Sequence, residues 1–166
     1  MSIPTKMLAI AFQHAGDANT PIADYYPTPS LNPGHVLIKV VAAGVNRPDI
    51  MQCQGLYLAP RGITFIFGLE ISGHVVALAT DVKTLTMGDS VCALVSGGGY
   101  AEYCLANAQL CLPVPAHTSL IHVAGIPETF FTVWSNLFDH AQLQNVTGSW
   151  RNKRHWNDRY TISTCF

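Results

Sequence analysis

Cysteines and histidines are the side chains that most often bind metals or act as nucleophiles and proton carriers. The 166-residue chain has five cysteines and seven histidines, with no CxxC pair and no HxxxH or HxH spacing. This pattern indicates neither a zinc ribbon nor a helical zinc site, and no serine, histidine and aspartate arrangement suggests nucleophilic hydrolysis. We expect most of the cysteines to be buried thiols: Cys53, Cys92, Cys104, Cys111 and Cys165.

Two further motifs are typical of turns. Asp89 follows Gly88 in an MGD sequence and is expected to form a turn. Gly97 to Gly99 could be mistaken for a phosphate-binding loop, but they lie between two expected strands instead of opening a helix. Such a position lacks the oriented N–H groups that bind phosphate, so we interpret the three glycines as a turn.

Four longer motifs occur in order: GVNRPD followed by MQCQGLY (44–57), FGLEISGHVVALA (67–79), TMGDSVCALVSGGGYAEY (86–103) and AGIPETFFTVW (124–134). Together they resemble the quinone oxidoreductase, or ζ-crystallin-like, branch of the medium-chain dehydrogenase/reductase superfamily, roughly over residues 6–142. The resemblance implies a mainly β fold with short helices, a GroES-like, partly open β-barrel followed by linker helices. Family members continue into a Rossmann domain, which is absent from this sequence.

The same superfamily has a zinc-dependent branch, which by the resemblance carries a thiolate ligand at position 46 and an imidazole ligand at position 69. This sequence has Asn46 and Leu69 there. Neither an amide nor an alkyl chain replaces thiolate and imidazole as zinc ligands, so we predict no metal site.

The resemblance also identifies candidate site residues. Asn46 corresponds to an amide near the nicotinamide ribose, with a catalytic and cofactor-binding role, and Tyr57 to a catalytic aromatic between cofactor and substrate. Thr132 corresponds to a cofactor-binding threonine. The alternatives are a turn residue, a barrel-rim aromatic and an interior helix residue. Glu70 would need partners if buried; Arg47 and Arg61 are candidates by the resemblance, and we expect a structural salt bridge.

The implied activity is zinc-independent hydride transfer from NADPH to a quinone or another α,β-unsaturated carbonyl. Without a metal, the rate would depend mainly on orienting the nicotinamide against an electron-poor acceptor. Two alternatives stay open: a fragment of an enoyl-thioester reductase, and a non-enzymatic remnant or interaction fragment.

Composition limits the other function classes. The chain is 49% hydrophobic and 11% charged, with a net charge of -1, which favours a globular domain and gives no basic surface for nucleic acid. The apolar stretch at residues 7–12 is too short for a signal peptide or a membrane span. We therefore expect a cytoplasmic protein that binds neither nucleic acid nor membrane.

The pattern of short apolar runs predicts strands near residues 7–12, 35–45, 70–79, 89–95 and 100–106. Helical spacing begins at Ser119, and Pro127 should divide that segment into two helices. We expect an incomplete GroES-like catalytic domain at 1–118, linker helices at 119–144 and an aberrant tail at 145–166.

The tail holds four of the nine basic residues and two of the three tryptophans, without amphipathic order. Read in another frame, its codons permit a glycine-rich nucleotide-binding turn, so we hypothesise a frameshift or aberrant splice near residue 145. We accordingly expect that this chain is inactive alone, that its stability is poor, and that the family's homodimer interface is lost.

Overall fold

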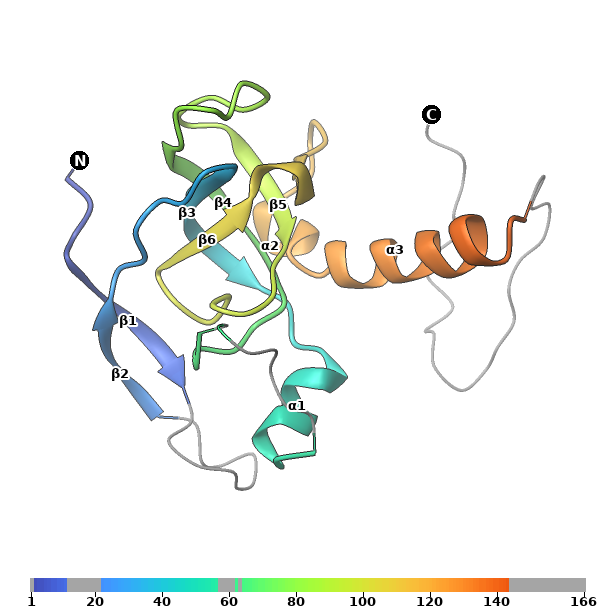
Figure 1. Cartoon of the computed structure of the whole chain (residues 1–166), viewed down its shortest axis with the longest axis horizontal. Coiled ribbons are helices and arrows are strands. Elements are labelled where there is room, and N and C mark those ends of the chain that lie inside the picture. Colours follow the sequence, from blue (N-terminus) through green and yellow to red (C-terminus); the bar gives the residue numbers. More distant parts are fainter. Residues whose placement is uncertain (1, 12–21, 57–61, 63, 144–166) are drawn as a thin grey trace. The chain divides into compact units, whose positions relative to one another are not determined.

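The computed structural model describes residues 2–11, 22–56, 62 and 64–143 (Figure 1). The chain divides into two compact units, Met1–Val133 and Trp134–Phe166. Tyr57, Arg61 and Cys165 lie outside the described residues, as does the tail at 145–166 with its frameshift hypothesis.

The first unit is built on an antiparallel sheet of five strands in the order β6-β3-β4-β5-β7 (Figure 1). Apolar side chains of its strands form one core cluster, in which Ile38, Ile71 and Val91 are fully buried. Burial of such β-branched side chains between strands is the main force that holds the sheet together. The strands are β3 (His35–Ala43), β4 (Glu70–Leu78), β5 (Ser90–Leu94), β6 (Tyr103–Asn107) and β7 (Cys111–Pro113).

A second sheet pairs β1 (Lys6–Ala11) with β2 (Ile22–Pro27). Every second residue of β1 is buried, as expected for a strand with one face on a core. Isolated bridges from Ala9 to Ala101 and from Ala11 to Ile66 join β1 to the loops of the larger sheet's strands. β2 had not been predicted from the sequence.

Short helices complete the described part of the chain. α1 (Arg47–Cys53) follows β3, and a 3-10 turn (Ala108–Leu110) precedes β7. Ser119 caps α2 (Leu120–Val123), and Pro127 is the first residue of α3 (Pro127–Trp134), so the predicted division of this segment is confirmed. In the second unit, Ser135–His140 form a π-helical segment, and the ring centroids of Trp134 and Phe138 lie 4.7 Å apart.

The predicted turns are confirmed. The Asp89 carboxylate accepts hydrogen bonds from the backbone N–H and the hydroxyl of Thr86, both at 2.8 Å. Gly97 and Gly98 lie between β5 and β6 with φ of 152° and 90°, conformations that glycine adopts readily. The mainly β architecture with short helices agrees with the expected fold. In the part of the chain that the structure describes, no helix is long and apolar enough to span a membrane.

Candidate active site

Asn46 lies where the chain leaves β3 and begins α1. Its backbone is extended, with φ of -119° and ψ of 162°, and it precedes the first helical residue. The Asn46 backbone N–H donates to Oδ2 of Asp49 at 2.8 Å, and the Asp49 N–H donates to the Asn46 carbonyl at 3.2 Å. These reciprocal bonds satisfy groups that a helix start would otherwise leave unpaired, and they fix the backbone of Asn46.

Asp49 fastens α1 to the segment before β4. Its side chain is only 3% exposed, and its second oxygen, Oδ1, accepts from the Gly68 N–H at 3.3 Å. The Cys53 thiol donates to the Asp49 carbonyl at 3.0 Å, one turn further along the helix. A short helix with little intrinsic stability is thereby held by tertiary contacts.

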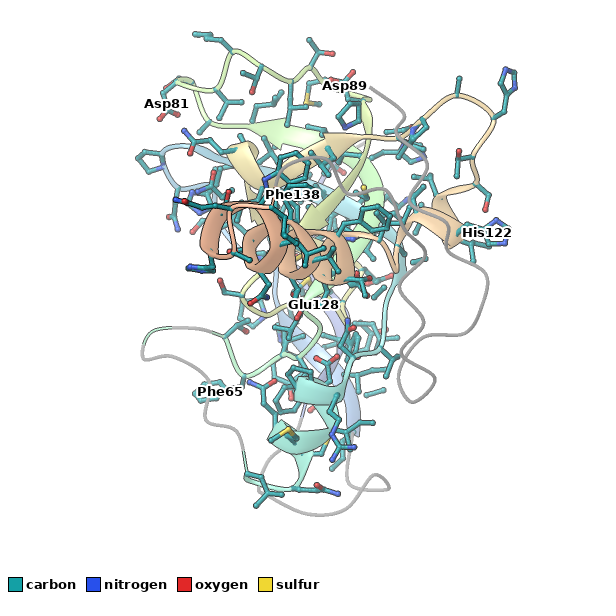
Figure 2. The ribbon with its side chains drawn as sticks, turned by 90° about the vertical axis from the view of Figure 1, so that its right-hand side faces the viewer. Phe65, Asp81, Asp89, His122, Glu128 and Phe138 are labelled. Carbon is teal, nitrogen blue, oxygen red and sulfur yellow. The ribbon has the colours of Figure 1, made fainter. Side chains whose placement is uncertain are left out.

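Glu70 connects Asn46 to α3. It is the first residue of β4 and is 2% exposed. Its Oε1 accepts a hydrogen bond from Asn46 Nδ2 at 2.8 Å, and its Oε2 accepts from the Glu128 backbone N–H at 2.9 Å. Figure 2 shows Glu128 on the side of α3 that faces α1. One carboxylate therefore joins segments 24 and 58 residues away in the sequence.

The contacts of Glu70 differ from the expected salt bridge with Arg47. Within the described residues, no ion pair joins Glu70 to the exposed Arg47, and the expected pairing with Arg61 lies outside those residues. In the described part of the chain, two uncharged N–H donors bond to the buried carboxylate. Such donors compensate part of the cost of burying a charge and need no second charge inside the protein.

Burial and neighbouring negative charges raise the pKa values of three groups here: Glu70, Glu128 and Tyr100. Burial raises the pKa of Glu70, and the negative charge of Asp49 adds to the rise, while the N–H bonds from Asn46 and Glu128 oppose it. Burial also raises the pKa of the Glu128 carboxyl, with smaller contributions from Glu70 and Asp49. Burial, followed by Asp49, raises the pKa of the Tyr100 hydroxyl, so this phenol stays protonated.

The structure describes two of the three predicted site residues. Asn46 is half-buried at the centre of the contacts above, whereas Thr132 is exposed on α3, one helical turn beyond Glu128. Tyr57 lies outside the described residues. Leu69, beside Glu70, presents an alkyl side chain, and across the described ranges no three His, Cys, Asp or Glu side chains are grouped to hold a metal.

Sequence reasoning missed Asp49, and it missed Glu70 as the partner of Asn46. The signal for Asp49 was present, because an asparagine followed three residues later by an acid is similar to a helix capping sequence. The contact between Asn46 and Glu70 depends on how β3 pairs with β4. That pairing cannot be predicted from a local sequence pattern.

Comparisons with known proteins agree with this architecture. The family model of the alcohol dehydrogenase GroES-like domain matches residues 32–116. The quinone oxidoreductase-like protein 2 homolog of Nematostella vectensis is 32% identical over 124 residues, covering 74% of this chain and 34% of that protein. The trans-enoyl reductase caaB of Aspergillus niger is 32% identical over 150 residues, covering 85% and 39%.

The human synaptic vesicle membrane protein VAT-1 homolog-like protein has a solved structure that superposes with a TM-score of 0.76 at 30% identity. The match covers 84% of this chain and 45% of that one. The chain spans about a third of the length of the curated relatives it matches. The expected GroES-like fold is confirmed by these matches. This chain belongs to the alcohol dehydrogenase GroES-like domain family of the medium-chain dehydrogenase/reductase superfamily and is similar to its quinone oxidoreductase-like members.

Proposed function

We propose that this chain forms the acceptor-facing part of a zinc-independent, NADPH-dependent reductase of quinones or other α,β-unsaturated carbonyls. The observation that supports it most is the hydrogen bond from Asn46 Nδ2 to Glu70. At the position where the zinc branch has a thiolate, this chain has an amide whose nitrogen donates a hydrogen bond to a carboxylate. Leu69 replaces the imidazole with an alkyl group. This donor set suits an organic ligand better than a metal ion.

The surroundings of Asn46 suit a flat, apolar acceptor. Val45 is 75% exposed and Ile50 is 47% exposed, so exposed apolar residues both precede and follow Asn46 in the sequence. Exposed apolar side chains beside a few fixed polar groups are typical of small-molecule sites. NADPH, when bound, would supply a hydride, and the reduced acceptor would take its proton from solvent. We assign Asn46 and Thr132 to holding the cofactor and Asn46 and Tyr57 to orienting the reactants.

We further propose that this chain alone holds NADPH too weakly for turnover. The sequence contains no G-x-G-x-x-G turn, the element that binds a dinucleotide pyrophosphate at a helix start. We assign residues 119–144 as linker helices that lead toward a nucleotide-binding domain in proteins of this family. Without such a domain, the cofactor would be contacted on one side only and would bury little of its surface.

An enoyl-thioester reductase is the second candidate function. The similarity to a protein named trans-enoyl reductase favours it. Both reactions place a hydride on an electron-poor carbon conjugated to a carbonyl, and both would use the same amide and apolar surface. The acceptor therefore has to be distinguished by experiment.

The experiment follows backbone NMR signals of the 166-residue chain during three separate titrations: 1,4-naphthoquinone, crotonyl-CoA and NADPH. We expect naphthoquinone to shift the signals of Val45, Asn46 and Ile50, and NADPH to give no saturable binding at micromolar concentration. Asn46→Ala should abolish the naphthoquinone response, whereas Asn32→Ala, which removes an exposed amide, should not.

Each titration can contradict one part of the proposal. Stronger shifts with crotonyl-CoA than with naphthoquinone would favour the enoyl reductase. No shift around Asn46 with either acceptor would reject the acceptor-facing role. Tight, saturable NADPH binding would reject the requirement for a second domain.

A further inference from the structure

The chemistry of Glu70 determines which way the Asn46 amide is turned. An ionised carboxylate only accepts hydrogen bonds, so the end of the amide that faces it must be the nitrogen. The observed Nδ2 to Oε1 distance of 2.8 Å fits a charge-assisted bond. Because nitrogen and oxygen project from opposite sides of the amide carbon, Asn46 Oδ1 is turned away from Glu70. The amide orientation thus follows from the nature of its partner.

Glu70 is itself held in place. Its other oxygen is bonded to the Glu128 N–H at 2.9 Å, and the residue is 2% exposed. A carboxylate bonded at both oxygens inside the protein has little freedom to rotate. Glu70 can therefore hold the Asn46 amide in one position. Its bond to the Glu128 N–H also fixes the first turn of α3 relative to that amide.

We propose that Glu70 is a positioning residue: it fixes the Asn46 amide so that its nitrogen, and not its carbonyl oxygen, faces the carboxylate, and it couples that amide to α3. The role in ligand binding rests on the proposed function. An amide oxygen accepts hydrogen bonds, so the fixed group suits a ligand hydroxyl, as on a nicotinamide ribose.

Two matched variants test the role. Glu70→Gln keeps the shape of the side chain but replaces one acceptor with a donor, so it cannot accept from both Asn46 Nδ2 and the Glu128 N–H. Glu102→Gln is the control, because Glu102 Oε2 also accepts a backbone N–H, that of Leu8 at 2.8 Å, at an exposed position directly before β6. Circular dichroism and thermal unfolding would establish that both variants fold.

The measurement is the side-chain amide NMR signal of Asn46 in the 166-residue chain. We expect one downfield, exchange-protected Asn46 amide proton in the wild type and in Glu102→Gln, and its loss in Glu70→Gln. Hydrogen exchange at the Glu128 N–H should accelerate at least tenfold in Glu70→Gln only. Unchanged Asn46 signals in Glu70→Gln, or equal changes in Glu102→Gln, would overturn the proposal.

A pH titration of the wild type needs no variant and covers the case in which Glu70→Gln does not fold. The Asn46 amide signals should move with the same midpoint as the Glu70 carboxyl carbon. Asp49, Glu128, Tyr100 and Cys92 also interact with Glu70, so their signals must be followed in parallel. Asn46 signals that follow Asp49 or Glu128 instead of Glu70 would contradict the assignment.

A ligand titration separates this proposal from the proposed function. Reduced nicotinamide mononucleotide carries the ribose without the adenosine half. At concentrations far above those of the NADPH titration, it should shift the Asn46 amide in the wild type and at least threefold less in Glu70→Gln. A wild type that does not respond would reject cofactor binding, and with it the ligand role proposed for Asn46, but would leave the measured orientation of the amide intact. An equal response in both proteins would reject the positioning role.

Discussion

Gly44 lies directly beside the Glu70 carboxylate, so close that a Cβ atom at position 44 would overlap Oε1. The Gly44 N–H also donates to the Glu70 backbone carbonyl at 3.2 Å. We predict that Gly44→Ala displaces the Glu70 side chain and lowers the free energy of unfolding by about 1–3 kcal/mol, as overpacking of a well-filled interior does. Urea denaturation would measure the loss, and the Asn46 amide signal would report the displacement.

Gly125 provides the matched control for that substitution. A Cβ there would meet the same Glu70 oxygen at 4.0 Å, an ordinary contact distance, and the residue is exposed between α2 and α3. Gly125→Ala should therefore change the free energy of unfolding by less than about 1 kcal/mol. If both alanine substitutions destabilised the protein equally, lack of space beside Glu70 would not be the reason that Gly44→Ala is unfavourable.

Asp49 should contribute more to stability than its chemically similar counterpart Asp89. Each carboxylate accepts two hydrogen bonds, Asp49 from the N–H groups of Asn46 and Gly68, and Asp89 from Thr86. Asparagine has a single acceptor oxygen, so Asp49→Asn leaves a backbone N–H facing an amide donor in the interior. We expect it to cost about 1–3 kcal/mol of unfolding free energy.

Asp89→Asn should cost less, because the Asp89 side chain lies at an exposed turn where water can replace the lost bond. Chemical denaturation of both variants under identical conditions measures the difference. If Asp89→Asn were the more destabilising change, burial would not be the property that distinguishes the two acids.

The raised pKa of Glu70 predicts a pH dependence of stability. Because its pKa in the folded chain lies above the ordinary value of 4.5, the folded state binds more protons than the unfolded state between these two values. The stabilisation from this group is fully present below pH 4.5 and is lost as the pH rises through the folded-state pKa. Glu128 acts in the same direction.

The lowered pKa of Asp89 acts in the opposite direction, and its contribution is lost as the pH falls through values below 3.8. Thermal unfolding followed from pH 4.5 upward therefore separates the effect of the two glutamates from that of Asp89. We expect the midpoint temperature to fall with rising pH in the wild type and to fall less steeply in Glu70→Gln. A slope that Glu70→Gln leaves unchanged, while Glu128→Gln removes it, would identify Glu128 as the responsible group.

Local pattern was sufficient to predict most of the strands that carry the core, because alternating apolar residues indicate that one strand face is buried. It missed β7, whose three residues are too few to show such a pattern. It also failed for β2, which ends at Pro27 and was not among the predicted strands. Among the residues that the structure describes, β2 pairs with β1 alone, and a proline at the end of an edge strand is tolerated because few of its backbone groups need partners in the sheet.

The site was predicted less completely for a similar reason. Asn46 could be identified from its motif. The α1 helix could not be predicted, because it has only seven residues and its apolar pattern is too short. The partner of Glu70 was expected to be an arginine, since a buried acid is usually paired. Only the pairing of β3 with β4 and the docking of α3 bring the Asn46 amide and the Glu128 N–H to it.

The cysteines should differ sharply in reactivity. Burial raises the pKa of the Cys104 and Cys111 thiols to about 12, whereas Cys53 on α1 is only half-buried, although burial also raises its pKa. The thiolate is the reactive form, and at a pH near 8.5, the ordinary thiol pKa, fewer than about one in a thousand of the buried groups are ionised.

In a Cys165→Ser background, we therefore expect iodoacetamide to modify Cys53 first and to reach Cys92, Cys104 and Cys111 only after unfolding in urea. Peptide mapping by mass spectrometry at successive times measures the order. The lack of reaction at the core thiols depends on the sheet staying closed, because Cys92 and Cys111 lie on the neighbouring strands β5 and β7. Alkylation of Cys111 as fast as Cys53 without denaturant would show that the β7 edge opens in solution, and it would support the expectation that this chain alone is poorly stable.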